Sequence, residues 1–118
     1  MPIIGLHAIL YSTKDDETRK FFKDVLGLPF VDAGHGWLIF KAPPAELAVH
    51  PGEADGRHEL YLMCDNIDAT IADFTSKGVT CGPITDEGWG RVASVKVAES
   101  TEVGLYEPRH PSPLHLKP

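Results

Sequence analysis

The sequence is short of cysteine, of long apolar runs and of clustered basic residues, and each shortage excludes a class of protein. Its two cysteines, Cys64 and Cys81, lie outside any Cys-x-x-Cys pair or Cys/His cluster, which favours two reduced, largely buried thiols. A disulfide between them stays open, because the sequence does not give their separation. No stretch approaches the roughly 20 apolar residues of a membrane span. The N-terminus lacks both regions of a signal peptide, so we expect a cytoplasmic protein with no membrane partner.

Positive charge is also in the minority. The chain has 11 Lys and Arg against 17 Asp and Glu, for a formal net charge of −6. Because no segment gathers the basic residues, nucleic acid is not an expected partner. The GxGxxG, P-loop, GxSxG and HExxH patterns are absent as well. Dinucleotide, nucleoside triphosphate, serine-hydrolase and zinc-peptidase chemistry therefore have no motif support.

The composition that remains is that of an ordinary globular domain. Of the 118 residues, 42% are hydrophobic and 24% are charged, and this length suits a single domain, residues 1–118, with a real core. In the first half, Thr13 is expected to cap a helix that ends at Gly27. The apolar and alternating runs predict strands at 3–11, 28–31, 37–41 and 46–50.

The same order of elements follows a polar connector at 51–56. Asn66 is expected to cap a second helix, which Gly78 closes. Strands are predicted at 58–64, 79–84, 91–97 and 103–107. The chain is therefore expected to be α+β, with one βαβββ module at about 3–50 and another at about 58–108.

Alternation along the predicted strands separates two sets of side chains, because successive strand residues point to opposite faces. One set is aliphatic and suits packing under the helices. The other set mixes the residues of a ligand cavity rather than those of a solvated face: His7, Tyr11, Glu46, His50, Glu59, Tyr61, Met63 and Tyr106.

Several segments resemble the vicinal-oxygen-chelate superfamily of glyoxalases, bleomycin resistance proteins and extradiol dioxygenases. They are GLHAILYSTKDDETRKFFKDVLGLPFV near the N-terminus, HELYLMCDNIDATIADFTSKGV in the middle and LYEP near the C-terminus. The resemblance covers roughly residues 3 to 108. It implies two modules that form a curved mixed sheet around a central cleft, with a small-molecule ligand. It also implies a homodimer, since two-module proteins of this kind commonly pair and open sheet edges need covering.

The resemblance further implies a divalent metal ion (Ni, Zn, Fe or Mn) in the cleft. Carried over by position, its ligands are His7, Glu46 with His50 on the same face, and Glu59. Gly104 stands where the superfamily usually has a carboxylate. Three protein ligands with waters still suffice for an open site, in which the ion would polarise two neighbouring substrate oxygens.

The residues also have plainer interpretations. His7 suits a hydrogen-bonded core histidine, and Glu46 and His50 suit solvated strand ends. Glu59 lies in an apolar strand, where a carboxylate needs a partner and could serve in catalysis. The hydroxyls of Tyr61 and Tyr106 could orient a substrate or donate a proton, although both rings also suit a core.

Two functions follow as hypotheses. The first is a metal-dependent enzyme, either a lyase or isomerase of the glyoxalase kind or a dioxygenase. The alternative is a metal-free protein of the bleomycin-resistance type, which sequesters a hydrophobic or aromatic compound. The missing carboxylate at Gly104 favours the alternative.

Overall fold

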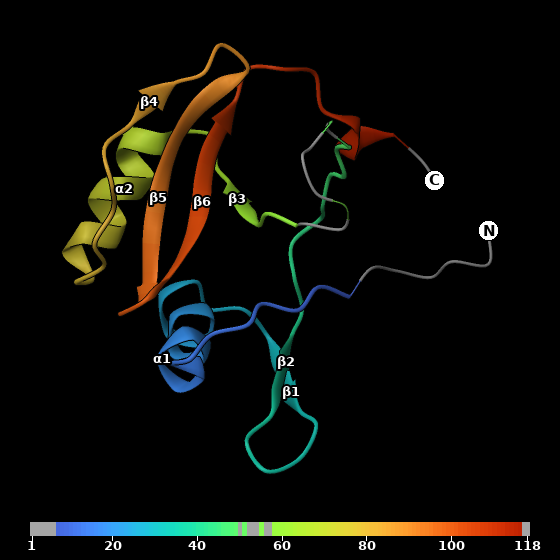
Figure 1. Ribbon diagram of the computed structural model, residues 1–118, viewed down its shortest axis with the longest axis vertical. Coiled ribbons are helices and arrows are strands. Elements are labelled where there is room, and N and C mark those ends of the chain that lie inside the picture. The colour runs from blue at the N-terminus through green and yellow to red at the C-terminus, as the bar shows by residue number, and fades with distance from the viewer. Residues whose placement is uncertain (1–6, 50, 52–54, 56–57, 117–118) are drawn as a thin grey trace.

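The computed structural model describes residues 7–49, 51, 55 and 58–116, and it confirms an α+β protein (Figure 1). The first module contributes one broken helix and one hairpin. The helix is α1 (Asp15–Lys20), which continues as the π-helix η1 (Phe21–Val25). The hairpin pairs β1 (Phe30–Asp32) antiparallel with β2 (Leu38–Phe40).

The second module has the full βαβββ order. Its elements are β3 (Tyr61–Met63), α2 (Ile67–Ser76), β4 (Thr85–Asp86), β5 (Gly90–Ala98) and β6 (Thr101–Pro108). They form a mixed sheet in the order β3-β6-β5-β4, in which β3 runs parallel to β6 and the other neighbours are antiparallel. The tail carries a short 3-10 helix, η2 (Pro113–His115). In the part of the chain that the structure describes, no helix is long and apolar enough to cross a bilayer.

The core lies between one face of this sheet and the helices. Alternate residues of β6, Val103 and Leu105, are 5% and 1% exposed. They pack with Val95 of β5, with Ile67 of α2 and with Phe21 of η1. The aliphatic face predicted from alternation therefore does pack under the helices, which leaves the opposite face of β3, β5 and β6 free to form a site.

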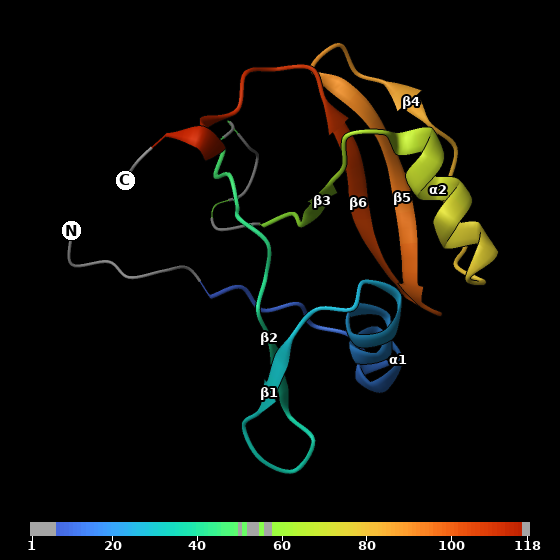
Figure 2. The same cartoon turned by 180° about the vertical axis from the view of Figure 1, so that it is seen from behind.

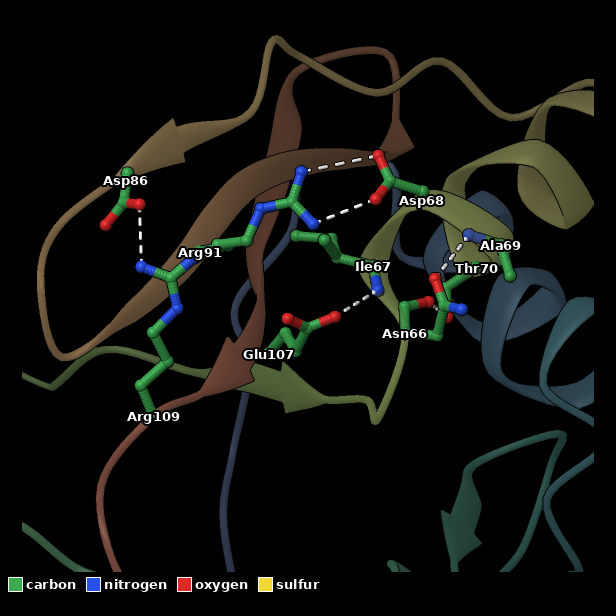
Figure 3. A network of polar contacts seen from close by, with 9 residues as sticks. All are labelled: Asn66, Ile67, Asp68, Ala69, Thr70, Asp86, Arg91, Glu107 and Arg109. Carbon is green, nitrogen blue, oxygen red and sulfur yellow. Dashed lines mark hydrogen bonds and ion pairs between the residues drawn. The ribbon is translucent and has the colours of Figure 1, made fainter.

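Polar contacts join the start of α2 to the ends of the two central strands, β5 and β6 (Figure 3). The Asn66 side chain caps the helix by accepting from the backbone N–H of Ala69 at 3.0 Å, as predicted. Glu107 of β6 reaches the same helix end and accepts from the N–H of Ile67, also at 3.0 Å. Arg91 of β5 pairs with Asp68 at 2.8 Å. Glu107 thus points away from the opposite sheet face and serves the fold.

The first module differs from its sequence-based expectation. Strands were predicted at 3–11 and 46–50, but the described residues 7–12 and 46–49 are in no strand. Residues 3–6 and His50 lie outside the described residues. Along these two segments Tyr11, Leu47 and Val49 are 86%, 80% and 90% exposed. Apolar side chains of this kind favour a strand only when a neighbouring strand covers them, and within one chain they remain uncovered.

A smaller difference concerns the segment 79–84, which was predicted as a strand. Cys81 makes one isolated bridge to Val95 there, and the regular strand β4 begins only at Thr85. Pro83 interrupts the segment, and because proline lacks the backbone N–H, it cannot donate to a continuous ladder.

The exposed surface is large for a chain of this mass. It amounts to 9171 Å², whereas a compact monomer of 12.9 kDa exposes about 6300 Å². The radius of gyration is 15.2 Å, compared with about 13.5 Å for a compact domain of this length. The exposed segments 7–12 and 46–49 contribute to this large area.

Because Glu107 accepts a hydrogen bond from the start of α2, its removal is expected to lower the stability of the fold. We expect Glu107→Ala to lower the free energy of unfolding by about 1–2 kcal/mol, because the N–H of Ile67 loses its charged acceptor. Glu107→Gln keeps an oxygen at that position and should lose less. Urea denaturation measures both changes, and equal stability of all three proteins would contradict the assignment.

Candidate functional site

The free face of the sheet forms the floor of an open cavity of about 580 Å³. Residues from the segment before α1, from β3 and its approach, and from β4, β5 and β6 line it: Leu10, His58, Glu59, Leu60, Tyr61, Pro83, Thr85, Val92, Ala93, Ser94, Glu102, Val103 and Gly104. A second groove, of about 320 Å³, lies between the first helix and β5, and none of these side chains lines it.

Three aromatic rings gather beside the cavity, and we call them the aromatic cluster: Tyr61, Trp89 and Tyr106. Tyr61 and Tyr106 have ring centroids 5.6 Å apart at 83°, and Trp89 meets Tyr106 at 5.7 Å and 67°. Tyr61 and Trp89 are 6.4 Å apart at 88°. This edge-to-face arrangement is a favourable one for aromatic rings. Tyr61 and Trp89 remain 36% and 46% exposed, whereas Tyr106 is 9% exposed.

Tyr61 is held at both ends. Its hydroxyl donates to Glu59 Oε2 at 2.8 Å. In the parallel register of β3 on β6, Tyr61 stands beside Gly104. The ring lies so near that glycine that a Cβ at position 104 would come within 2.9 Å of Tyr61 Cγ, and closer still to Cδ1 and Cε1. The ring therefore occupies the space in which a side chain from position 104 would begin.

Tyr106 is tied to a second set of groups, which we call the Glu46 cluster: Glu46, Tyr106, His110 and Ser112. The Tyr106 hydroxyl donates to Glu46 Oε1 at 2.8 Å, and the Ser112 hydroxyl donates to Glu46 Oε2. The cluster joins the segment before residue 50, strand β6 and the C-terminal tail. Figures 1 and 2 show from opposite sides that this segment passes beside η2.

His110 completes the Glu46 cluster. Its ring stacks on Tyr106 at a centroid distance of 6.0 Å and an angle of 29°. His110 Nδ1 lies 2.8 Å from the Pro111 carbonyl oxygen, and since a carbonyl only accepts, Nδ1 carries a proton. His110 Nε2 then faces Tyr106 Oη at 3.4 Å and Glu46 Oε1 at 3.9 Å.

The pKa values follow from these contacts. Hydrogen bonds from Ser112 and then from Tyr106 lower the pKa of the Glu46 carboxyl below its usual value. Burial, followed by the hydrogen bond to the Glu46 carboxylate, raises the pKa of Tyr106 to about 12. Tyr106 is therefore a neutral phenol whose proton is engaged by Glu46, which is a poor arrangement for proton transfer at neutral pH.

The structure brings together some of the residues predicted from sequence. Glu59 and Tyr61 line the cavity, as expected, and Tyr106 lies beside them in the aromatic cluster. His7 is exposed on the segment 7–12, from which Leu10 contributes to the cavity lining. His50 lies outside the described residues.

A metal site was tested against the donors that are present. Both carboxylate oxygens of Glu46 accept hydrogen bonds from protein hydroxyls, and the Tyr61 ring fills the space beside Gly104. Across residues 7–49, 51, 55 and 58–116, no three His, Cys, Asp or Glu side chains are grouped so that they could hold an ion. The described residues do not fit a metal, and ligation by His7, Glu46, His50 and Glu59 stays a prediction.

The sequence did not indicate three participants. Trp89 is one corner of the aromatic cluster. His110 and Ser112, from the tail after β6, belong to the Glu46 cluster. The one available signal was the presence of a polar serine and a histidine shortly after the last strand, where they can fold back against it. No spacing rule predicts that they contact Glu46.

Comparison with solved structures identifies the class of fold. TnmS3, an antibiotic binding protein from Streptomyces sp. CB03234, superposes with a TM-score of 0.65 at 21% identity, covering 92% of this chain and 98% of that one. Lactoylglutathione lyase from Agrobacterium tumefaciens gives 0.62 at 16% identity, covering 90% and 95%. A glyoxalase/bleomycin resistance protein from Streptomyces sp. CB03234 gives 0.53 at 22%, covering 80% and 91%.

These likenesses confirm the fold that the sequence resemblance implied. The chain has the glyoxalase/bleomycin-resistance fold over about nine tenths of its length. No family model matches the sequence, and no curated protein matches it either.

The hydrogen bond between Tyr106 and Glu46 predicts the pKa of Tyr106, the tyrosine expected to ionise at the highest pH. Folding raises the pKa of Tyr106 from 10.0 to about 12, so the folded chain retains a proton that the unfolded chain releases. The stability that this shift provides is complete below pH 10.0 and is lost as the pH rises toward about 12. We expect Glu46→Gln to lower this pKa but to leave it above the ordinary value, because burial, the larger cause, remains.

Phenolate absorbance measured against pH tests this expectation, and Tyr106→Phe identifies the transition among the three tyrosines. If Tyr106 has the same pKa in the Glu46→Gln protein as in wild type, Glu46 does not raise the pKa of Tyr106.

Proposed function

We propose that this protein binds a small molecule with a flat aromatic portion against the aromatic cluster, and that no metal ion takes part. The observation that carries the proposal is the cavity of about 580 Å³, with Tyr61 and Trp89 both partly exposed beside it. Ligand sites of this size are typically apolar and aromatic with a few placed polar groups. The antibiotic-binding description of TnmS3 supports the same interpretation.

The polar groups fit a binding role better than a catalytic one. Tyr106 has its proton engaged by Glu46 and a pKa of about 12, so we propose that it contributes its ring and its position. Glu59 orients Tyr61 through the hydroxyl. Lyase, isomerase or dioxygenase chemistry would need ligands from outside the described residues or from a second chain.

We also propose that two copies form the working unit, because the first module needs a partner. An obligate dimer buries about 1,000–2,500 Å² of each chain, so a dimer contact would account for much of the area, about 2,900 Å², by which this chain exceeds a compact monomer. Leu47 and Val49 follow Glu46 on the exposed segment 46–49, so we propose that the second chain covers their apolar side chains. The free thiols of Cys64 and Cys81 suit the cytoplasm as the proposed location.

Trp89 provides the test of ligand binding. Aminoanthracene, a flat and neutral fluorescent probe, should bind and quench Trp89, and Trp89→Ala should weaken binding by about tenfold because a stacking surface is lost. Trp37→Ala is the matched control, since Trp37 is 68% exposed on the hairpin and does not belong to the aromatic cluster that Trp89 forms with Tyr61 and Tyr106. If the two variants bind equally well, or if the wild-type chain does not bind, the proposed site is wrong.

Sedimentation at micromolar concentration tests the dimer. The expected mass is twice 12.9 kDa, and Leu47→Glu should shift the protein toward the monomer, because a charge would then be buried at the contact. Ala72→Glu, at an exposed position of α2 on the other face of the sheet, should leave the mass unchanged. A wild-type protein that sediments as a monomer throughout this range would contradict the proposal.

A further inference from the structure

Gly104 lies directly under the ring of Tyr61. The two residues are partners in the parallel register of β3 and β6, where neighbours project from the same face of the sheet. A Cβ on Gly104 would meet three atoms of the Tyr61 ring inside the 3.0 Å that real Cβ atoms keep. Of those atoms, Cγ is at the base of the ring, so the ring cannot avoid the contact by moving its tip alone.

Other contacts hold the ring where it is. Its hydroxyl donates to Glu59, and its edge and face meet Tyr106 and Trp89. Tyr106 is itself fixed through Glu46. A side chain at position 104 would therefore displace Tyr61 from the aromatic cluster, and the arrangement depends on glycine at that position.

We propose that Gly104 determines the ligand class of the cavity, because the missing side chain leaves room for the Tyr61 ring to lie against β6. The inference rests on the proposed binding function and specifies it. With glycine at position 104, the flat ring of Tyr61 from β3 lies over β6 and faces the cavity, and the site accepts a planar aromatic group. With any side chain there, the ring leaves, and β6 presents that side chain instead. A carboxylate ligand from position 104 and the Tyr61 ring exclude one another.

A double-mutant cycle on the full-length chain tests, without a ligand, whether the Tyr61 ring requires glycine at position 104. Gly104→Ala should lower the melting temperature by several degrees, because the new Cβ meets the ring. In a Tyr61→Ala background, the same change should cost little or nothing. Gly82→Ala is a control, since its Cβ would meet the hydroxyl end of Ser94, and its effect should not depend on Tyr61. If Gly104→Ala lowers the melting temperature equally in both backgrounds, or in neither, the proposed contact between Gly104 and the Tyr61 ring is wrong.

Aminoanthracene then tests the ligand class. Gly104→Ala should bind the probe about tenfold more weakly than wild type, because the displaced ring no longer offers its surface. Trp37→Ala, on the hairpin and away from the aromatic cluster, should bind as wild type does. If wild type and Gly104→Ala bind alike, Gly104 does not determine the ligand class, although the proposed function survives. If wild type does not bind the probe, the proposed function and the ligand class both fail. The double-mutant cycle then shows only whether the Tyr61 ring requires glycine at position 104.

Discussion

The parallel pairing of β3 with β6 is the constraint on which the site depends. It sets Tyr61 beside Gly104, and the missing side chain lets the tyrosine ring lie against the strand. From there the ring meets Tyr106 and Trp89 edge to face. The alternation that buries Leu105 under the helices also turns Gly104 and Tyr106 toward the opposite face. One strand thus provides both the core and the floor of the cavity.

A second constraint is the set of hydrogen bonds that links the end of the first module to the last strand and the tail. Glu46, from the end of the first module, accepts hydrogen bonds from β6 and from the tail. Because Ser112 and Tyr106 hold both of its oxygens, this carboxylate positions an aromatic ring. The same position was predicted as a metal ligand, and that role stays a prediction. In the described residues both of its oxygens accept hydrogen bonds from hydroxyls of the last strand and the tail.

Local patterns in the sequence predicted the second module well. The Asn66 cap, the helix that it starts and the two faces of the last strand depend on residues close together in the chain. The first module was predicted less well, because alternation at 7–12 and 46–49 specifies a strand only when another strand lies alongside. The Glu46 cluster was not predictable, since Ser112 reaches Glu46 across 66 residues and no periodicity encodes that contact.

The central proposal is that this cavity binds its ligand against the aromatic cluster without a metal ion. Metal analysis of untagged protein, purified without chelators and then soaked in nickel, zinc, iron or manganese, tests it most directly. The account predicts less than stoichiometric metal in every case, with no change after Glu46→Gln or Glu59→Gln. One tightly held ion per chain that disappears in either variant would contradict the account and restore the metal-dependent interpretation.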